Sequence, residues 1–242
     1  MIPPEAPAEG KEFYHYTYPE LCQLIGETRA LEKVDMYQQP VYQHLNCRLL
    51  ASYHNQEPGL LERRCSVFYA PVTNTTRQKQ LTIAQVAELI RSPAFKPQTD
   101  HLRTITDKKE NRKYKAAAFS YATFSGTFTR RANNCLIQHA NLICVDLDHI
   151  GGHLMEVRAK VMADPETVLC FVSPNGDGLK VLYEVDPHSH TQEDWYKACS
   201  NYLGIVTGIS MEMVDKSCKD VSRACFLPHD PELFINPRYT TL

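Results

Sequence analysis

Asn141-Leu142-Ile143-Cys144-Val145-Asp146-Leu147-Asp148 is an apolar run that ends in two aspartates. Such a run, closed by a Gly-Gly pair at 151–152, predicts a buried strand. Side chains alternate between the faces of a strand, so Asp146 and Asp148 should point the same way, about 7 Å apart, with Leu147 in the core. Two such carboxylates repel each other, and Mg²⁺ or Mn²⁺ with oxygen ligands relieves that repulsion. On this motif alone, aspartates that merely cap the following helix are an equal alternative.

Length, charge and cysteine content limit the classes of protein to consider. The 242 residues can form one large domain or two small ones, and the net charge of -2 gives no overall attraction to nucleic acid. Apolar stretches are too short for a membrane-spanning helix, and the first residues lack the features of a signal peptide. The nine cysteines include no Cys-x-x-Cys pair, which favours reduced thiols over disulfides or a zinc site. We therefore expect a cytoplasmic protein with no membrane partner.

The part of the chain before residue 141 has the weaker signals. Residues 1–62 predict only a lead-in segment, helical at best around 21–31. Residues 63–140 predict an N-terminal α/β subdomain with a helix over 81–90, for which Thr82 is the expected N-cap. Its expected strands cover 66–70, 116–119 and 122–128.

Residues 141–242 have a clearer order of elements and predict a catalytic subdomain. Helices are expected over 153–162 and 191–206, the second capped by Thr191. The expected strands cover 141–148, 167–173, 179–185 and 223–227. This order is β-α-β-β-α-β, the split βαβ arrangement of ferredoxin-like and RRM-like domains, in which the first and third strands are neighbours. The predicted fold class is therefore α/β of the α+β kind, with the N-terminal α/β half packed across this one and 63–242 forming one unit.

A glycine-rich turn follows the second predicted strand of the chain's second half. Its sequence is Ser173-Pro174-Asn175-Gly176-Asp177-Gly178-Leu179-Lys180. Gly176 and Gly178 allow close backbone approach, so amides around Asn175 can bind an anion, with the Ser173 hydroxyl and the Lys180 ammonium on either side. Asn-Gly and Asp-Gly are also common hairpin signals, so a plain hairpin is the alternative. Because the strand order places Lys180 beside the aspartates, we favour phosphate binding.

A third polar group spans 214–223 and supplies further candidates. Asp215 and Asp220 are both candidates for a third carboxylate, and Arg223 can hold a phosphate with two hydrogen bonds. A solvated loop of mixed charge is the alternative. Acidic residues, a glycine-rich turn, a lysine and an arginine on one face would suit phosphoryl transfer by two metal ions.

The order of these motifs resembles the archaeo-eukaryotic primase–polymerase superfamily. Its motifs are Asp-x-Asp, then Ser-x-x-Gly-x-Gly-x-Lys, then Asp with an arginine eight residues later, here Asp146, Asp148, Ser173, Lys180, Asp215 and Arg223. The stretches 121–128 and 222–231 are similar to the bacterial VirE N-terminal branch, and the resemblance covers 66–236. Lys180 stands where active primases usually have histidine.

The resemblance implies template-dependent nucleotidyl transfer, of the DNA primase or polymerase kind. Asp146, Asp148 and Asp215 would hold two Mg²⁺ or Mn²⁺ ions, and Ser173, Lys180 and Arg223 would contact nucleoside triphosphates. It also implies a single-stranded DNA template, a helicase partner or C-terminal helicase region, and replication of a mobile element. For the template we expect two basic groups with interleaved aromatic residues, represented by Lys113, Lys115, Arg130 and Arg131.

Two other classes of function fit the same residues. A haloacid-dehalogenase-type phosphatase also uses Asp-x-Asp after an apolar strand, followed by Ser, Lys and a late acidic pair, but it requires a parallel sheet. A catalytically decayed domain that only binds nucleic acid is the third hypothesis.

Overall fold

The computed structural model describes residues 11–42, 44–45, 47–50, 59–215 and 219–240. The chain divides into two compact units, residues 1–58 and 59–242. The first unit contains α1 (Tyr18–Ile25) and α2 (Glu27–Tyr37), which pack through apolar residues such as Leu21, Ala30 and Val34. Parts of the expected lead-in, residues 1–10 and 51–58, lie outside the described residues. Among the described residues, no helix is long and apolar enough to cross a membrane.

The described residues of the second unit form two four-stranded sheets and a hairpin. One has the strand order β2-β1-β3-β9, formed by β2 (Gln78–Thr82), β1 (Arg64–Phe68), β3 (Tyr121–Thr123) and β9 (Cys225–Phe226). The other has the order β10-β7-β8-β6, formed by β10 (Phe234–Ile235), β7 (Thr167–Val172), β8 (Leu179–Glu184) and β6 (Leu142–Leu147). A separate hairpin joins β4 (Gly126–Phe128) to β5 (Leu136–His139). Strand pairing is antiparallel throughout these sheets, so the expected α+β class is confirmed.

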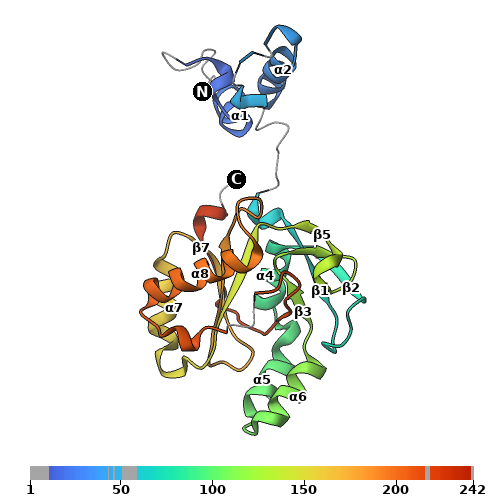
Figure 1. The fold of residues 1–242 in the computed structure, drawn as a ribbon, viewed down its shortest axis with the longest axis vertical. Helices are drawn as coiled ribbons and strands as arrows, with labels where there is room; N and C mark the ends of the chain where they lie inside the picture. Colours follow the sequence, from blue (N-terminus) through green and yellow to red (C-terminus); the bar gives the residue numbers. More distant parts are fainter. Residues whose placement is uncertain (1–10, 43, 46, 51–58, 216–218, 241–242) are drawn as a thin grey trace. The chain divides into compact units, whose positions relative to one another are not determined.

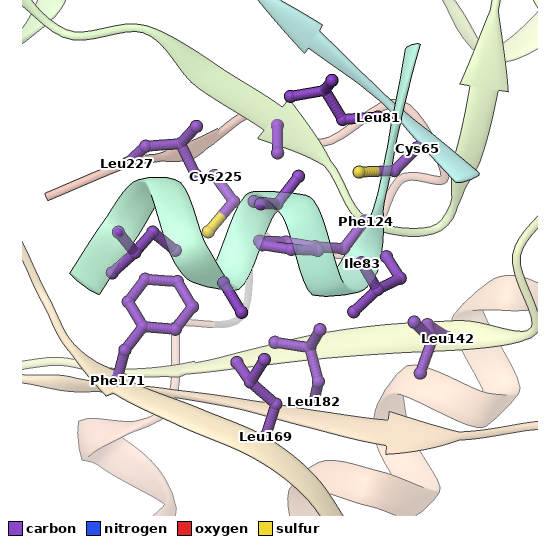
Figure 2. Close-up of a cluster of buried hydrophobic side chains, with 14 of the residues drawn as sticks. Cys65, Leu81, Ile83, Phe124, Leu142, Leu169, Phe171, Leu182, Cys225 and Leu227 are labelled. Carbon is purple, nitrogen blue, oxygen red and sulfur yellow. The ribbon is translucent and has the colours of Figure 1, made fainter. Parts of the chain in front are cut away.

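Helices cover the second sheet on both faces. On one face lie α7 (Leu154–Ala163) and α8 (Gln192–Thr207), packed against Ile143, Val145 and Leu147 of β6 (Figure 1). On the other face, α4 (Ile83–Arg91) lies between the two sheets. Figure 2 shows this layer, with Cys65 and Leu81 of the first sheet on one side of α4 and Leu169 and Leu182 of the second sheet on the other. The strand β6 therefore has a core on each side until it reaches its aspartates.

Local signals place these helices as expected. Thr82 caps α4 and accepts a hydrogen bond from the Gln85 amide, and the Gln85 side chain accepts one from the Thr82 amide in return. Thr191 caps α8 in the same way through the Asp194 amide. Both predicted N-caps are confirmed.

The charged stretch before β3 forms a pair of helices. It consists of α5 (Lys96–Thr104) and α6 (Lys108–Ala118), which lie side by side in green in Figure 1. The expected strand over 116–119 is wrong, because 116–118 form the last turn of α6. Alanine and lysine are strong helix formers, and the Asp107 side chain caps the helix by accepting from the Glu110 amide. The expected strand over 122–128 is divided by a turn into β3 and β4.

The last strand of the split βαβ pattern is also placed differently. The expected strand over 223–227 contains β9, but β9 pairs with β3 of the first sheet and not with β6. Phe226 contacts the rings of Phe119 and Tyr121, which holds it in that sheet. The position beside β6 is taken by residues 213–215, through a single antiparallel bridge between Leu147 and Val214. The first and third strands of the pattern, β6 and β8, are neighbours as expected.

Candidate metal centre

The end of β6 presents two aspartates on one face of its sheet. Leu147 is fully buried among the residues that face α7 and α8, so Asp146 and Asp148 on either side of it point to the opposite face. The segment 213–215 runs alongside, since the Asp148 amide donates to the Met213 carbonyl at 2.8 Å and the Asp215 amide donates to the Asp146 carbonyl at 3.0 Å. Backbone pairing thus carries Asp215 to the two aspartates of β6.

Carboxylate oxygens of Asp146, Asp148 and Asp215 all lie within 4.8 Å of one another. All three side chains are partly buried, and each offers hard oxygen ligands of the kind that Mg²⁺ and Mn²⁺ prefer. Asp146 Oδ1 is buried and has no hydrogen-bond partner among the described residues. A buried carboxylate oxygen without a donor needs a cation or water, so the donor set fits a divalent metal.

Lys180 lies directly opposite Asp146 in the pairing of β6 with β8. Its ammonium forms an ion pair with Asp146 Oδ2, and only 6% of the residue is exposed. Burial would lower the pKa of Lys180, but the Asp146 carboxylate together with two neighbouring thiols outweighs burial, so the pKa is raised well above its usual range. Lys180 is therefore a permanent positive charge beside the aspartates.

The surroundings of Asp148 disfavour its charged form. Its pKa is raised by burial and by repulsion from Asp146 and Asp215, against the attraction of Lys180 and Lys115. Raised carboxyl pKa values of this origin are typical of sites where acids are gathered for a function.

Asp215 is held on two sides. Arg223 forms an ion pair with Asp215 Oδ2 at 3.0 Å, and the Tyr196 hydroxyl of α8 donates to the Asp215 carbonyl at 2.5 Å. Asp220, the other candidate for a third carboxylate, is exposed and accepts a hydrogen bond from the Asn133 amide. It lines a separate small cavity of about 20 Å³ that Asp146, Lys180 and Arg223 also line.

The glycine-rich turn lies against the end of β6. A Cβ atom on Gly178 would be 2.3 Å from the Leu147 carbonyl oxygen, so only glycine lets the turn approach this closely. Gly176 has a φ of +82° and lies against Arg103, whose guanidinium donates to the carbonyls of Ser173 and Pro174. The Ser173 hydroxyl is buried without a hydrogen-bond partner among the described residues. Of the residues expected to bind phosphate, Lys180 and Arg223 each form an ion pair with an aspartate.

A larger cavity opens on the other side of Asp148, between the helical pair and the turn. Its volume is about 400 Å³, and Asp148, His149, Asn175 and Asp177 line it. Among the described residues, the lining also includes four cationic side chains: Arg103, Lys108, Arg112 and Lys115. Burial and the charge of Lys180 lower the pKa of Lys115. Sequence reasoning missed Arg103 in this place, and the only signal was the density of charge over 100–115.

The residues expected to bind nucleic acid lie on two segments, α6 and the stretch after β4. Lys115 lines the 400 Å³ cavity, whereas Lys113 is exposed on α6. Arg130 is exposed in a turn, and the Arg131 guanidinium lies 5.2 Å from the ring centre of Tyr121 and donates to the Val72 carbonyl.

Comparison with known proteins identifies the family. Residues 113–234 match the family model described as BT4734-like, N-terminal domain, and this match covers just over half of the 242 residues. The chain belongs to this family. Its BT4734-like segment begins inside α6 and ends in β10, so it contains the three aspartates, the glycine-rich turn, Lys180 and Arg223. No curated protein and no solved structure matches the chain.

Proposed function

We propose that this BT4734-like chain is a nucleotidyltransferase that extends or starts a strand on a single-stranded DNA template, using nucleoside triphosphates and two Mg²⁺ or Mn²⁺ ions. The observation that carries the proposal is the convergence of Asp146, Asp148 and Asp215, with the Asp146 Oδ1 atom left without a donor among the described residues. When bound, the metal ions would activate the attacking 3′-hydroxyl and neutralise the leaving pyrophosphate.

The remaining residues of the site have positioning and electrostatic roles in this proposal. Lys180 fixes one oxygen of Asp146 and offsets part of the repulsion among the three carboxylates. Arg223 and Tyr196 hold Asp215 at the end of β6. Such fixed charges stabilise a transition state without rearranging during the reaction.

The motif order supports the same proposal, since it resembles that of the primase–polymerase superfamily. By that resemblance we place the reaction in the replication of a mobile element, in the cytoplasm, with a helicase acting beside it. Lysine at position 180 does not reproduce the geometry of the histidine that this superfamily usually has there, but it supplies a positive charge that can bind a triphosphate.

Two alternatives differ in their expected results. We do not favour a haloacid-dehalogenase-type phosphatase, because β6, β7 and β8 pair antiparallel and that fold requires a parallel sheet. A domain that only binds nucleic acid would bind DNA without metal and incorporate no nucleotide.

The test is nucleotide incorporation on a primed and an unprimed single-stranded template with Mn²⁺. Asp146→Asn and Asp215→Asn should each lower the rate by about 100-fold or more, since the loss of even an outer-shell partner of a metal ligand lowers activity 10- to 100-fold. Asp100→Asn, an exposed carboxylate on α5, is the matched control and should leave the rate unchanged. Undiminished incorporation by Asp146→Asn would exclude the proposal.

A further inference from the structure

The 400 Å³ cavity next to Asp148 has the composition of an anion site. Four cations line it (Arg103, Lys108, Arg112 and Lys115), against two carboxylates, Asp148 and Asp177. Asp177 is already engaged, because its Oδ2 atom lies 3.0 Å from Nδ1 of His149. Volumes of 300–1,000 Å³ are typical of sites for small ligands. The cavity can therefore take a multiply charged anion of small-molecule size.

The cations of this cavity lie on two neighbouring helices, α5 and α6. Arg103 on α5 is tied to the turn, donating to the Pro174 carbonyl at 3.2 Å and to the Ser173 carbonyl at 3.4 Å. Lys108, Arg112 and Lys115 follow one another along α6 at spacings of four and three residues, and residues three or four apart on a helix lie on the same face. Lys115, the innermost of them, is only partly exposed and lies 6.0 Å from the ring centre of Phe226.

The expected phosphate ligands are placed differently. The Lys180 ammonium is buried on Asp146, and the Arg223 guanidinium is paired with Asp215, so both cations balance the charge of the metal ligands. Asp148 belongs both to the aspartate cluster and to the wall of the 400 Å³ cavity. The cavity therefore reaches the candidate metal centre.

We propose that this cavity binds the polyphosphate tail of a nucleoside triphosphate, with Arg103, Lys108, Arg112 and Lys115 as its ligands and its reacting end toward Asp148. The inference rests on the proposed function and names where its substrate binds. Guanidinium and ammonium groups form charge-assisted hydrogen bonds with phosphate oxygens, which are about twice as strong as neutral ones.

The test measures binding of inorganic triphosphate in the presence of a metal chelator, so that it depends on neither metal nor catalysis. The double variant Lys108→Ala/Arg112→Ala removes two charges from the cavity. The control Lys79→Ala/Lys109→Ala removes two charges from exposed positions outside the cavity lining. We expect the first variant to bind about tenfold more weakly, and the control to bind within about twofold of the unmodified protein.

A second arm separates the two sources of phosphate. The same variants are titrated with single-stranded oligonucleotides that carry either a 5′-phosphate or a 5′-hydroxyl. Equal weakening of triphosphate binding by both double variants, or no weakening by either, would overturn the inference. So would weakening confined to the 5′-phosphorylated oligonucleotide, because the cavity would then hold the end of a strand.

This result is independent of the test for the proposed function. If triphosphate binding depends on Lys108 and Arg112 while the unmodified protein incorporates no nucleotide, polymerisation is excluded and the polyphosphate site stands. If nucleotides are incorporated but both variants bind triphosphate as well as the unmodified protein does, the assignment of the site is wrong and the proposed function is unaffected.

Discussion

Asp148 illustrates at the scale of a single residue how the gathering of acids at the candidate metal centre lowers stability. Burial and the neighbouring carboxylates raise its pKa, so the folded protein keeps this proton to a higher pH than the unfolded chain does. The free energy of unfolding therefore falls as the pH rises from the ordinary aspartate pKa through the raised one. At neutral pH, without metal, the ionised side chain destabilises the fold.

We therefore predict that Asp148→Asn is more stable than the unmodified protein at neutral pH. The gain should be about 0.5–1 kcal/mol after allowance for solvent screening, because the side chain is only partly buried. In acid, where Asp148 is protonated in both states, the difference should vanish. Urea unfolding at both pH values measures it, and added Mn²⁺ should stabilise the unmodified protein more than the variant. A destabilised variant at neutral pH would contradict this account of Asp148.

Gly178 is a position where the addition of a single Cβ atom should destabilise the fold. An added Cβ would meet the Leu147 carbonyl oxygen at 2.3 Å and the Ser173 hydroxyl at 3.1 Å, so the turn would have to move away from β6. Gly178→Ala should lower the free energy of unfolding by about 2 kcal/mol, measured by urea unfolding. Gly152→Ala is the control, since no heavy atom lies within 4 Å of the added carbon, and it should stay within about 0.5 kcal/mol. Equal effects of the two substitutions would mean that the close approach does not constrain the turn.

At the scale of the element, α4 connects the two sheets of the second unit. Its buried residues Ile83, Val86 and Ile90 belong to one apolar cluster with residues of both sheets, and Figure 2 shows the helix between side chains of the two sheets. A helix in this position must be apolar on more than one side, and its capping box at Thr82 determines where it begins.

Ile83→Ala should lower the free energy of unfolding by about 2–5 kcal/mol, because Ile83 is fully buried between the sheets and its removal leaves a cavity. Thermal or urea unfolding measures the loss. Glu88→Ala, on an exposed position of the same helix, should change stability by no more than about 0.5 kcal/mol. A loss for Ile83→Ala as small as that of the control would show that α4 is not packed between the sheets.

At the scale of the whole molecule, the division into residues 1–58 and 59–242 has a consequence for folding. Each unit has its own cluster of buried apolar residues, which is what a segment needs to fold by itself. A protein that begins at Gly59 should therefore unfold in a single transition, with the same urea midpoint as the corresponding transition of the full chain. A midpoint lowered by the truncation would show that the first unit stabilises the second.

Much of the second unit could be predicted from local sequence. Alternation along 141–148 places Asp146 and Asp148 on one face, and Thr82 and Thr191 mark helix starts, because these features depend only on residues a few positions apart. The order of elements also places β8 beside β6, so that Lys180 lies opposite Asp146.

Only the tertiary structure decided the rest, because it depends on contacts between residues far apart in the chain. The pairing of Leu147 with Val214 carries Asp215 to the aspartates, and the rings of Phe119 and Tyr121 hold β9 in the first sheet. Arg103 reaches the glycine-rich turn from a helix about 70 residues earlier, a meeting that no local pattern records. Strand alternation and helix capping depend on residues that are close in the sequence. The strand that pairs with a given edge, and the group that pairs with a given charge, depend on the packing of the whole unit.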